Sequence, residues 1–132
     1  MAVGVVTGLI IRDGKILMCQ RKAGKMYPFH WEFPGGKIEE NETLFHALQR
    51  ELHEELEISI TEAKEWFEDT MTYDNDMTYH VTFFYVKDFL GEPVNTEFEE
   101  IRWFSLEELD IIQQLSGNAN ILRKIKEKGF PK

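Results

Sequence analysis

The stretch from residue 35 to residue 58 constrains the fold and the chemistry of this chain more than any other. Two glycines open it and are expected to form a turn, an amphipathic helical pattern follows, and the last turns of that helix carry Glu51, Glu54 and Glu55. At about 100° per residue, these three acids share one helix face and repel one another. The residues four and three positions before Glu51 are Ala47 and Leu48, neither of them basic. We therefore expect a positive partner from outside the helix.

A divalent cation is the natural partner for such a cluster. Mg²⁺ takes oxygen ligands and is usually held by a few carboxylates together with substrate phosphates. Residues 39 to 57 contain seven glutamates and one arginine, Arg50, so their balance is −6 in a chain whose net charge is −9. Charge alone is equally consistent with an acidic, solvated surface helix. The order of the residues favours the metal site, for which we expect Mg²⁺, with Mn²⁺ as a substitute.

This order matches a known sequence motif. After a glycine and five further residues comes a glutamate, and after seven more come Arg-Glu, an apolar residue, any residue and Glu-Glu. The matching positions are Gly36, Glu42, Arg50, Glu51, Leu52, Glu54 and Glu55. The pattern resembles the Nudix box, and the flanking Trp-Glu-Phe-Pro-Gly-Gly-Lys segment resembles that of MutT-type nucleoside triphosphate pyrophosphohydrolases. One position departs from the family, because Glu57 stands where the motif has its second glycine.

The resemblance implies a fold and an activity. The fold is an α/β/α sandwich, with a mixed, curved β-sheet between helices, and residues 1–132 form it as a single domain. The activity is Mg²⁺-dependent hydrolysis of a nucleoside triphosphate to nucleoside monophosphate and pyrophosphate, with nucleotide-pool sanitation as its purpose. Glu51, Glu54 and Glu55 are the expected metal ligands, and the backbone carbonyl of Gly35 can join them. Arg50 is expected to orient the glutamates by ion pairing.

The residue that removes a proton from the attacking water is left open by the sequence. In MutT-type enzymes the general base lies on the loop after the Gly-Glu-Pro segment, and Glu97 is the best match to it. Glu99 and Glu100 compete for the same role. Glu51, already at the metal, is a further alternative.

Five residues are expected to bind substrate. Phe33 and Asn118 match the family's pocket phenylalanine and the asparagine that reads an oxidised guanine, which favours 8-oxo-dGTP. Each has a plainer explanation, since Phe33 could belong to the core and Asn118 could cap a helix. Arg21, with Lys22 beside it, ends a strand where it could face an anion or simply solvent, and Lys37 follows the two glycines. Tyr79 stands where MutT has an arginine, so CTP or dCTP is the alternative substrate.

Other functional classes fit the sequence less well. A dinucleotide or nucleotide-sugar substrate is compatible with the same motif. A non-catalytic nucleotide-binding module is a further alternative, although such modules tend to lose the metal-binding acids, all of which are present here. A purely structural protein would leave the acidic cluster unexplained.

Composition limits the partners and the compartment. A net charge of −9 without a basic run argues against binding to a nucleic acid polymer. Cys19 is the only cysteine, so no intrachain disulfide forms, and a reducing compartment, the cytoplasm, is expected. No apolar stretch reaches the length of a membrane span, and residues 2 to 11 are expected to form a strand rather than a signal sequence. The chain is expected to be a monomer or a homodimer.

The remaining elements follow from periodicity and turn signals. Strands are expected over residues 3–11, 15–21, 31–33, 58–72, 79–86 and 101–104, with a turn at 73–76. The acidic helix is expected to start at Asn41 or Thr43, and to bury Phe45, Leu48, Leu52 and Leu56 while His46 and His53 face solvent. Ser105 and Glu108 predict a capping box for a short helix, and a last helix is expected over residues 118–128, burying Ile121, Leu122 and Ile125. At Glu57 the left-handed turn that ends the acidic helix costs about 1 kcal/mol without glycine.

Overall fold

The structure, a computed structural model, describes residues 2–72 and 76–132. Residues 73–75 of the turn predicted between the two long strands lie outside this part of the chain. The strands of the described residues are β1 (Ala2–Arg12), β2 (Lys15–Gln20), β3 (Trp31–Glu32), β4 (Gly35–Lys37), β5 (Ser59–Thr72), β6 (Thr78–Leu90) and β7 (Glu100–Phe104). Their helices are α1 (Leu44–Leu56), α2 (Ala119–Lys128) and the short 3₁₀ helices η1 (Glu107–Asp110) and η2 (Ser116–Asn118).

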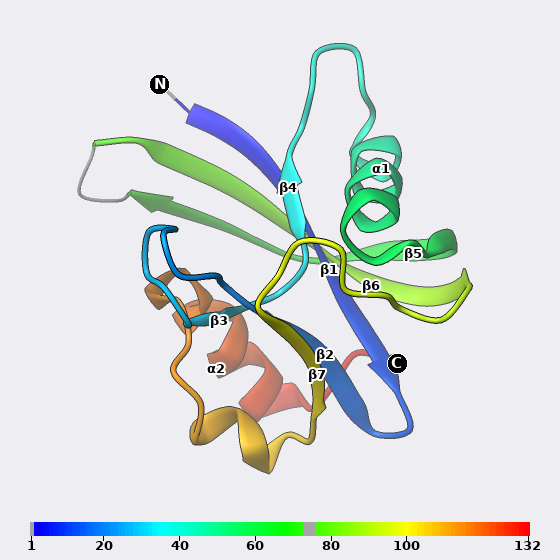
Figure 1. The fold of residues 1–132 in the computed structure, drawn as a ribbon. Helices are drawn as coiled ribbons and strands as arrows, with labels where there is room; N and C mark the ends of the chain where they lie inside the picture. The colour runs from blue at the N-terminus through cyan, green and yellow to red at the C-terminus, as the bar shows by residue number, and fades with distance from the viewer. Residues whose placement is uncertain (1, 73–75) are drawn as a thin grey trace.

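The sheet is built on β1. This strand pairs in parallel with β6 over its first nine residues, and antiparallel with β4 near its start and with β2 at its end. The long β5–β6 hairpin extends the sheet on one side, while β3 and β7 both pair with β2 on the other. The strand order is therefore β3-β2-β1-β6-β5, with β4 and β7 as branches (Figure 1). Mixed pairing of this kind confirms the predicted sheet.

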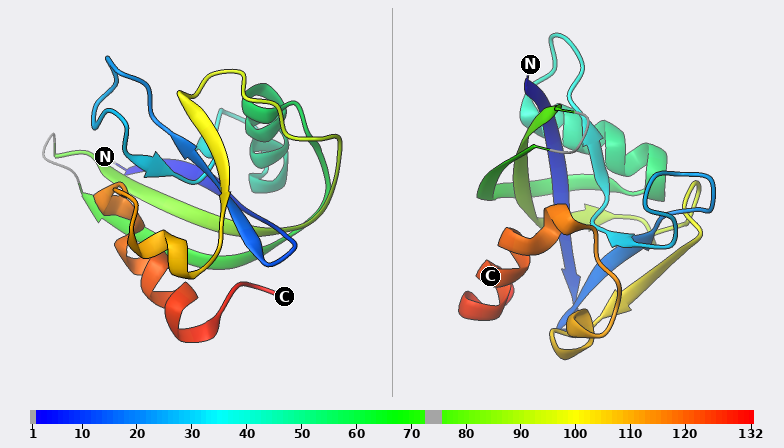
Figure 2. Two further views of the ribbon diagram at one scale, coloured as in Figure 1. Left: turned by 60° about the horizontal axis from the view of Figure 1, so that its bottom comes forward. Right: turned by 90° about the vertical axis from the view of Figure 1, so that its left-hand side faces the viewer.

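The two helices cover opposite faces of this curved sheet (Figure 2). Side chains alternate along β2, so that Leu17 and Cys19 join the core beneath α1, whereas Ile16 and Met18 join the core beneath α2. The helix residues that are fully buried in these cores are Ala47, Leu48, Leu52 and Leu56 of α1 and Ile121 and Ile125 of α2. The predicted three-layer architecture is thus confirmed. No helix in the described part of the chain is both long enough and apolar enough to span a membrane.

The glycine segment before α1 differs from the prediction. Gly35–Lys37 was expected as a turn, but it forms β4, which pairs antiparallel with residues Val5 to Thr7 of β1. Gly35 has φ +155°, and a Cβ there would lie 2.1 Å from the carbonyl oxygen of Val6. Only glycine allows the two backbones to approach this closely, so the turn signal in the sequence marks a tight strand pairing instead.

The C-terminal helical elements also differ from the prediction in detail. Ser105 and Glu108 form the reciprocal bonds of the expected capping box, from Ser105 N to Glu108 Oε1 at 2.8 Å and from Glu108 N to Ser105 Oγ at 3.3 Å. The helix they start is a single 3₁₀ turn, η1. The last helix also begins with a 3₁₀ turn, η2, before α2 itself starts at Ala119.

Both ends of α1 are capped as the sequence indicates. Thr43, rather than Asn41, is the N-cap, because its hydroxyl accepts a hydrogen bond from the amide of His46. At the other end Glu57 adopts the left-handed conformation, with φ 58° and ψ 28°, and its amide bonds to the carbonyl of His53. The geometry of the family's terminal glycine is therefore retained by a residue with a side chain.

We expect Glu57→Gly to raise the free energy of unfolding by about 0.5 to 1 kcal/mol, because glycine adopts the left-handed conformation without a Cβ clash. Urea denaturation measures the change. Glu57→Ala is the matched control, since it removes the carboxylate but keeps the Cβ, and it should bring no such gain. Equal stabilisation by alanine would assign the effect to charge instead of backbone conformation.

Candidate active site

Two consecutive glycines bring the backbone of β4 against the acidic face of α1. A Cβ at Gly36 would lie 2.4 Å from the carboxylate carbon of Glu51, far inside any real contact. The amide of Gly35 donates a hydrogen bond to Oε1 of Glu55 at 3.1 Å. Because neither glycine has a side chain, the carboxylates of Glu51 and Glu55 lie directly on the strand backbone.

Arg50 organises the acids around it. Its guanidinium donates to Glu42 at 2.7 and 2.9 Å, to Glu51 at 2.9 Å and to the carbonyl of Lys37 at 3.0 Å, and it lies 3.6 Å from Glu54. The hydrogen bonds from Arg50 lower the pKa of Glu42 to about 2. Arg50 thus forms the ion pairs with the glutamates that were expected of it, and the helix supplies one positive partner of Glu51 from the adjacent position.

The environment of Glu55 differs from that of Glu51 and Glu54. It is only 7% exposed, and it forms no ion pair with a Lys or Arg side chain in residues 2–72 and 76–132. Burial, and then the negative charge of Glu51, raise the pKa of Glu55 to about 9, against the opposing hydrogen bond from Gly35. The site therefore contains a buried acid that has no Lys or Arg partner among the described residues.

The donors around Glu55 fit a hard cation. The carboxylates of Glu51 and Glu55 and the backbone of Gly35 and Gly36 border the same space, and all of them offer oxygen, which Mg²⁺ prefers. Within the described residues, no three Asp, Glu, His or Cys side chains already converge as a ready-made ligand set. Glu54, whose side chain is 55% exposed beside Arg50, lies outside this space.

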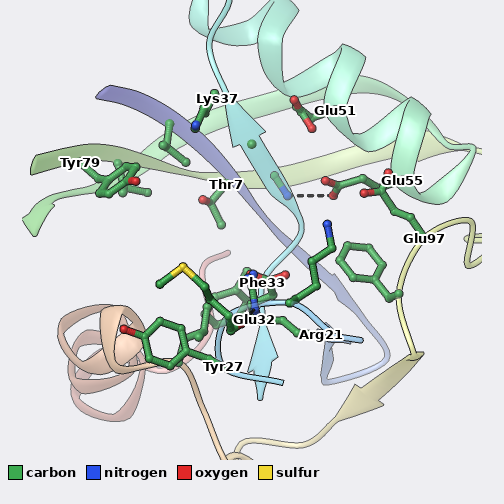
Figure 3. A pocket seen from close by; sticks show the side chains of 18 of the residues that line it. Thr7, Arg21, Tyr27, Glu32, Phe33, Lys37, Glu51, Glu55, Tyr79 and Glu97 are labelled. Atoms are coloured by element: carbon green, nitrogen blue, oxygen red, sulfur yellow. Dashed lines mark hydrogen bonds and ion pairs between the residues drawn. The ribbon is translucent and has the colours of Figure 1, made fainter. Parts of the chain in front are cut away.

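One cavity of about 710 Å³ adjoins these acids, a size typical of small-molecule sites. Of the eleven residues predicted to act in catalysis or to bind metal or substrate, eight line it, namely Arg21, Phe33, Gly35, Lys37, Glu51, Glu55, Tyr79 and Glu97. In Figure 3, Glu51, Glu55 and Glu97 gather on one side of the cavity, whereas Tyr27 and Tyr79 lie away from them. Three of the four acids that line the cavity are thus separated from its two tyrosines. Arg50, Glu54 and Asn118 are not among the lining residues.

The loop between β2 and β3 adds positive charge to the cavity. Arg21 is half-buried and holds this loop through the carbonyl of Met26, at 2.7 Å, and the carboxylate of Glu32, at 3.1 Å. Burial raises the pKa of Glu32, and Arg21 opposes that rise. Lys22 and Lys25 also line the cavity. Cationic groups and carboxylates therefore face the same space, as a metal-bound polyphosphate would require.

The structure separates the three acids proposed for the loop after β6. Glu97 lines the cavity, and its charge contributes to the raised pKa of Glu55. Glu100 begins β7 and is bonded to Arg102 at 2.7 Å. Glu99 is exposed and does not line the cavity, and its amide bonds to the carbonyl of Gln20. Of the three, only Glu97 lines the cavity.

Asn118 is held by hydrogen bonds within the protein. It is buried, and its amide nitrogen lies 2.9 Å from Gln114 Oε1 and 3.3 Å from the carbonyl of Trp31. It stands at the N-cap position of α2, but its side chain makes no capping bond, and its contact with a nucleobase stays a prediction. Its neighbour in the same turn, Leu115, lines the cavity instead.

Several lining residues were not singled out from the sequence. Thr7, Val81 and Met71 come from strands and contribute to the cavity wall, but an inward strand position cannot be assigned to a cavity before the pairing is known. Lys25 belongs to a loop that the sequence marks only as basic. Its place four residues after Arg21 was the available signal.

These features define a class of protein. Carboxylates for a divalent cation, basic side chains for phosphate and an apolar, aromatic remainder together describe a hydrolase site for a phosphorylated ligand that also has an apolar part. A helix of glutamates packed on a glycine strand gives this site its geometry.

Comparison with known proteins agrees with this class. The family model of the NUDIX domain matches residues 2–126. The CTP pyrophosphohydrolase of Escherichia coli (strain K12) is 39% identical over 104 residues, which cover 79% of this chain and 76% of that protein. The 8-oxo-dGTP diphosphatase of Haemophilus influenzae is 32% identical over 124 residues, covering 92% and 89%. The chain belongs to the Nudix family and is a Nudix hydrolase.

Solved structures support the same assignment. The MutT NUDIX hydrolase from Burkholderia pseudomallei superposes with a TM-score of 0.86 at 26% identity, over 95% of this chain and 98% of that one. The E. coli ORF135 protein superposes with a TM-score of 0.84 at 33% identity, over 96% and 89%.

The buried acid has a measurable consequence for stability without metal. The pKa of Glu55 is about 9 in the folded protein and about 4.3 in an unfolded chain, so between these values the folded state holds a proton that the unfolded state releases. Its contribution to stability is complete below the unfolded pKa and is lost as pH rises through the folded pKa. Relative to wild type, Glu55→Gln should therefore gain stability with rising pH, by about 1 kcal/mol per pH unit.

Urea denaturation in chelator at several values between pH 5 and pH 9 tests this. Glu127→Gln, an exposed substitution on α2, is the matched control and should follow wild type at every pH. A Glu55→Gln curve parallel to wild type would mean that Glu55 is not held as a buried acid.

Proposed function

We propose that this Nudix hydrolase converts a nucleoside triphosphate to nucleoside monophosphate and pyrophosphate with Mg²⁺, or with Mn²⁺ in its place. The observation that supports this most directly is that one cavity combines three kinds of side chain. Glu51, Glu55 and Glu97 border it on one side, the cations of the β2–β3 loop line it, and its two tyrosines lie farther away. Such a cavity suits a ligand with a charged chain and a flat, apolar end.

Glu51 and Glu55 would hold the metal together with Glu54 and, through its carbonyl, Gly35. Bound there, the metal would neutralise phosphate oxygens and lower the pKa of a bound water. Glu54 would join this set only by turning away from Arg50, 3.6 Å from it. Arg50 fixes Glu51 through its hydrogen bond at 2.9 Å, and so positions the ligand set without entering it.

Glu97 is the proposed general base, with Glu51 as the alternative. As it takes a proton from the attacking water, the water oxygen forms a bond to an internal phosphorus. The bond from that phosphorus to the bridging oxygen of the pyrophosphate group breaks, and pyrophosphate leaves with the electron pair on that oxygen. A positioned base of this kind contributes about 10²- to 10⁴-fold to the rate. Arg21 and Lys37 are the proposed contacts for the phosphate chain.

The proposed substrate is an oxidised purine triphosphate such as 8-oxo-dGTP, as in the name of the Haemophilus influenzae relative. Phe33 supplies an aromatic wall. Asn118 is bonded to Gln114 and to the carbonyl of Trp31, and its amide would exchange the bond to Gln114 for one to a base edge. CTP is the second candidate. It is favoured by Tyr79, which lines the cavity where MutT has an arginine, and by the name of the Escherichia coli relative.

Product analysis tests the reaction. With Mg²⁺, wild type should release nucleoside monophosphate and pyrophosphate in equal amounts from a triphosphate, and chelator should abolish this. Glu54→Gln and Glu55→Gln should each lower kcat by at least about 100-fold, because each removes a charge that holds the metal. Near-normal hydrolysis by these variants would refute the metal assignment. Release of inorganic phosphate, or cleavage of nucleotide sugars alone, would refute the proposed reaction.

The choice of base is tested by kcat/KM for 8-oxo-dGTP, dGTP, CTP and dCTP. We expect 8-oxo-dGTP to be preferred, and Asn118→Ala to lower its kcat/KM about tenfold more than that of CTP, because a lost base contact costs about 1 to 3 kcal/mol. Asn120→Ala is the matched control, since that exposed side chain bonds to Asp69 outside the cavity. Equal losses on all bases would make Asn118 a packing residue, and a wild-type preference for CTP would favour the second candidate.

A further inference from the structure

The end of α1 is closed by a segment about 40 residues away in the sequence. The last turn of a helix leaves carbonyl groups without partners inside the helix. Here the loop between β6 and β7 donates hydrogen bonds to those carbonyl groups. The amide of Val94 donates to Leu56 O at 2.8 Å, and the amide of Thr96 donates to Glu55 O at 3.3 Å. In Figure 1 this loop, drawn in yellow, passes along the end of the helix.

The side chain of Thr96 makes the shortest of these contacts. Its hydroxyl lies 2.7 Å from the carbonyl oxygen of Glu54 and 2.9 Å from that of Glu55, and its single proton is shared between the two acceptors. Thr96 is thereby tied through backbone and side chain to the two residues whose carboxylates are proposed metal ligands. It also directly precedes Glu97, the proposed base.

A second set of hydrogen bonds, between Asn95 and Phe98, holds the chain around Glu97. Asn95 Oδ1 accepts from the amide of Phe98 at 2.8 Å, and Asn95 Nδ2 donates to the carbonyl of Phe98 at 2.9 Å. Phe98 lines the cavity together with Glu97. The backbone that carries Glu97 is therefore a closed turn, and Thr96 is the point at which this turn is fastened to α1.

The start of the loop is anchored separately. Glu92 receives two hydrogen bonds of 2.8 Å from Arg12, whose guanidinium lies 4.5 Å from the centre of the Trp103 ring. This contact fixes where the loop leaves β6, but it is exposed and four residues from Thr96. The contacts of Thr96 are closer in the sequence to Glu97, and so they control the position of Glu97 relative to Glu55 more directly.

We propose that Thr96 is a positioning residue, whose hydroxyl holds the Glu97 loop in register with the metal-binding end of α1. This inference rests on the proposed function, in which Glu97 takes the proton from water. A change in the position of α1 would then carry the base loop with it, and the distance between base and metal ligands would be kept. A misplacement of about 1 Å in such a site can cost 100-fold in rate.

The test compares Thr96→Val, which keeps the shape and removes the hydroxyl, with Thr96→Ser, which keeps the hydroxyl. With Mg²⁺ and a triphosphate substrate, Thr96→Val should lower kcat about tenfold with KM changed less than about twofold, and Thr96→Ser should stay within about twofold of wild type. Thr61→Val is the matched control, since it removes an exposed threonine bond to Asp88 outside the cavity, and it should leave kcat unchanged.

The Glu97→Gln background separates positioning from a merely structural role. If Thr96 acts through Glu97, Thr96→Val should add less than about twofold to the loss caused by Glu97→Gln. The same loss in both backgrounds, an unchanged kcat in Thr96→Val, or a change confined to KM would overturn the inference. Full activity of Glu97→Gln would overturn it together with the assignment of the base.

Amide hydrogen exchange on the metal-free protein gives a readout independent of activity. The amides of Val94 and Thr96 should exchange about tenfold faster in Thr96→Val than in wild type, while the amides of the β1–β6 pairing keep their rates. Unchanged exchange in the loop would overturn the inference even if activity fell. Wild type that releases no pyrophosphate from any triphosphate would refute the proposed function, and the exchange rates would still decide whether Thr96 holds the loop.

Discussion

The close approach of β4 to α1 is the constraint on which the rest of this structure depends. A side chain at Gly36 would overlap the carboxylate of Glu51, so the helix can present its acids to the cavity only because the strand has no Cβ there. The same approach lets the amide of Gly35 reach Glu55. The pairing of β4 with β1 in turn fixes the strand, and so the position of the site is set by the centre of the sheet.

Charge is distributed unevenly over this contact. Arg50 is bonded to Glu42 and Glu51, so a positive charge lies between these two carboxylates. Glu55 has a backbone amide but no basic partner within the described residues. Burying a lone carboxylate is unfavourable unless it is protonated or meets a cation. The folded chain thus holds an unfavourable interaction that a divalent ion would relieve, which is how a binding site gains affinity at the cost of stability without its ligand.

The sequence predicted the parts of the structure that local patterns determine. The apolar stripe of α1 and the two long hairpin strands follow from periodicity, and the acids from a motif. It did not predict that Gly35–Lys37 is a strand, because the pairing depends on β1, about 30 residues earlier. It assigned Asn118 to a cap or a base contact, whereas the buried carbonyl of Trp31, 87 residues away, is one of its partners. Glu57 shows that propensity can be overridden, since it closes the helix end in the left-handed conformation although it is not a glycine.

The cavity is assembled from segments that share no local signal, and the geometry between them has to be held by contacts outside it. The proposed metal ligands lie on α1, whereas the proposed base lies on a loop about 40 residues later, and neither carboxylate can fix the other because like charges repel. Neutral groups of the backbone can do so. The carbonyls of Glu54 and Glu55 and the hydroxyl of Thr96 join the two segments just behind the charged side chains. The hydrogen bonds of the Thr96 hydroxyl to the backbone of α1 therefore hold the two segments together, although the acids that they carry into the site repel one another.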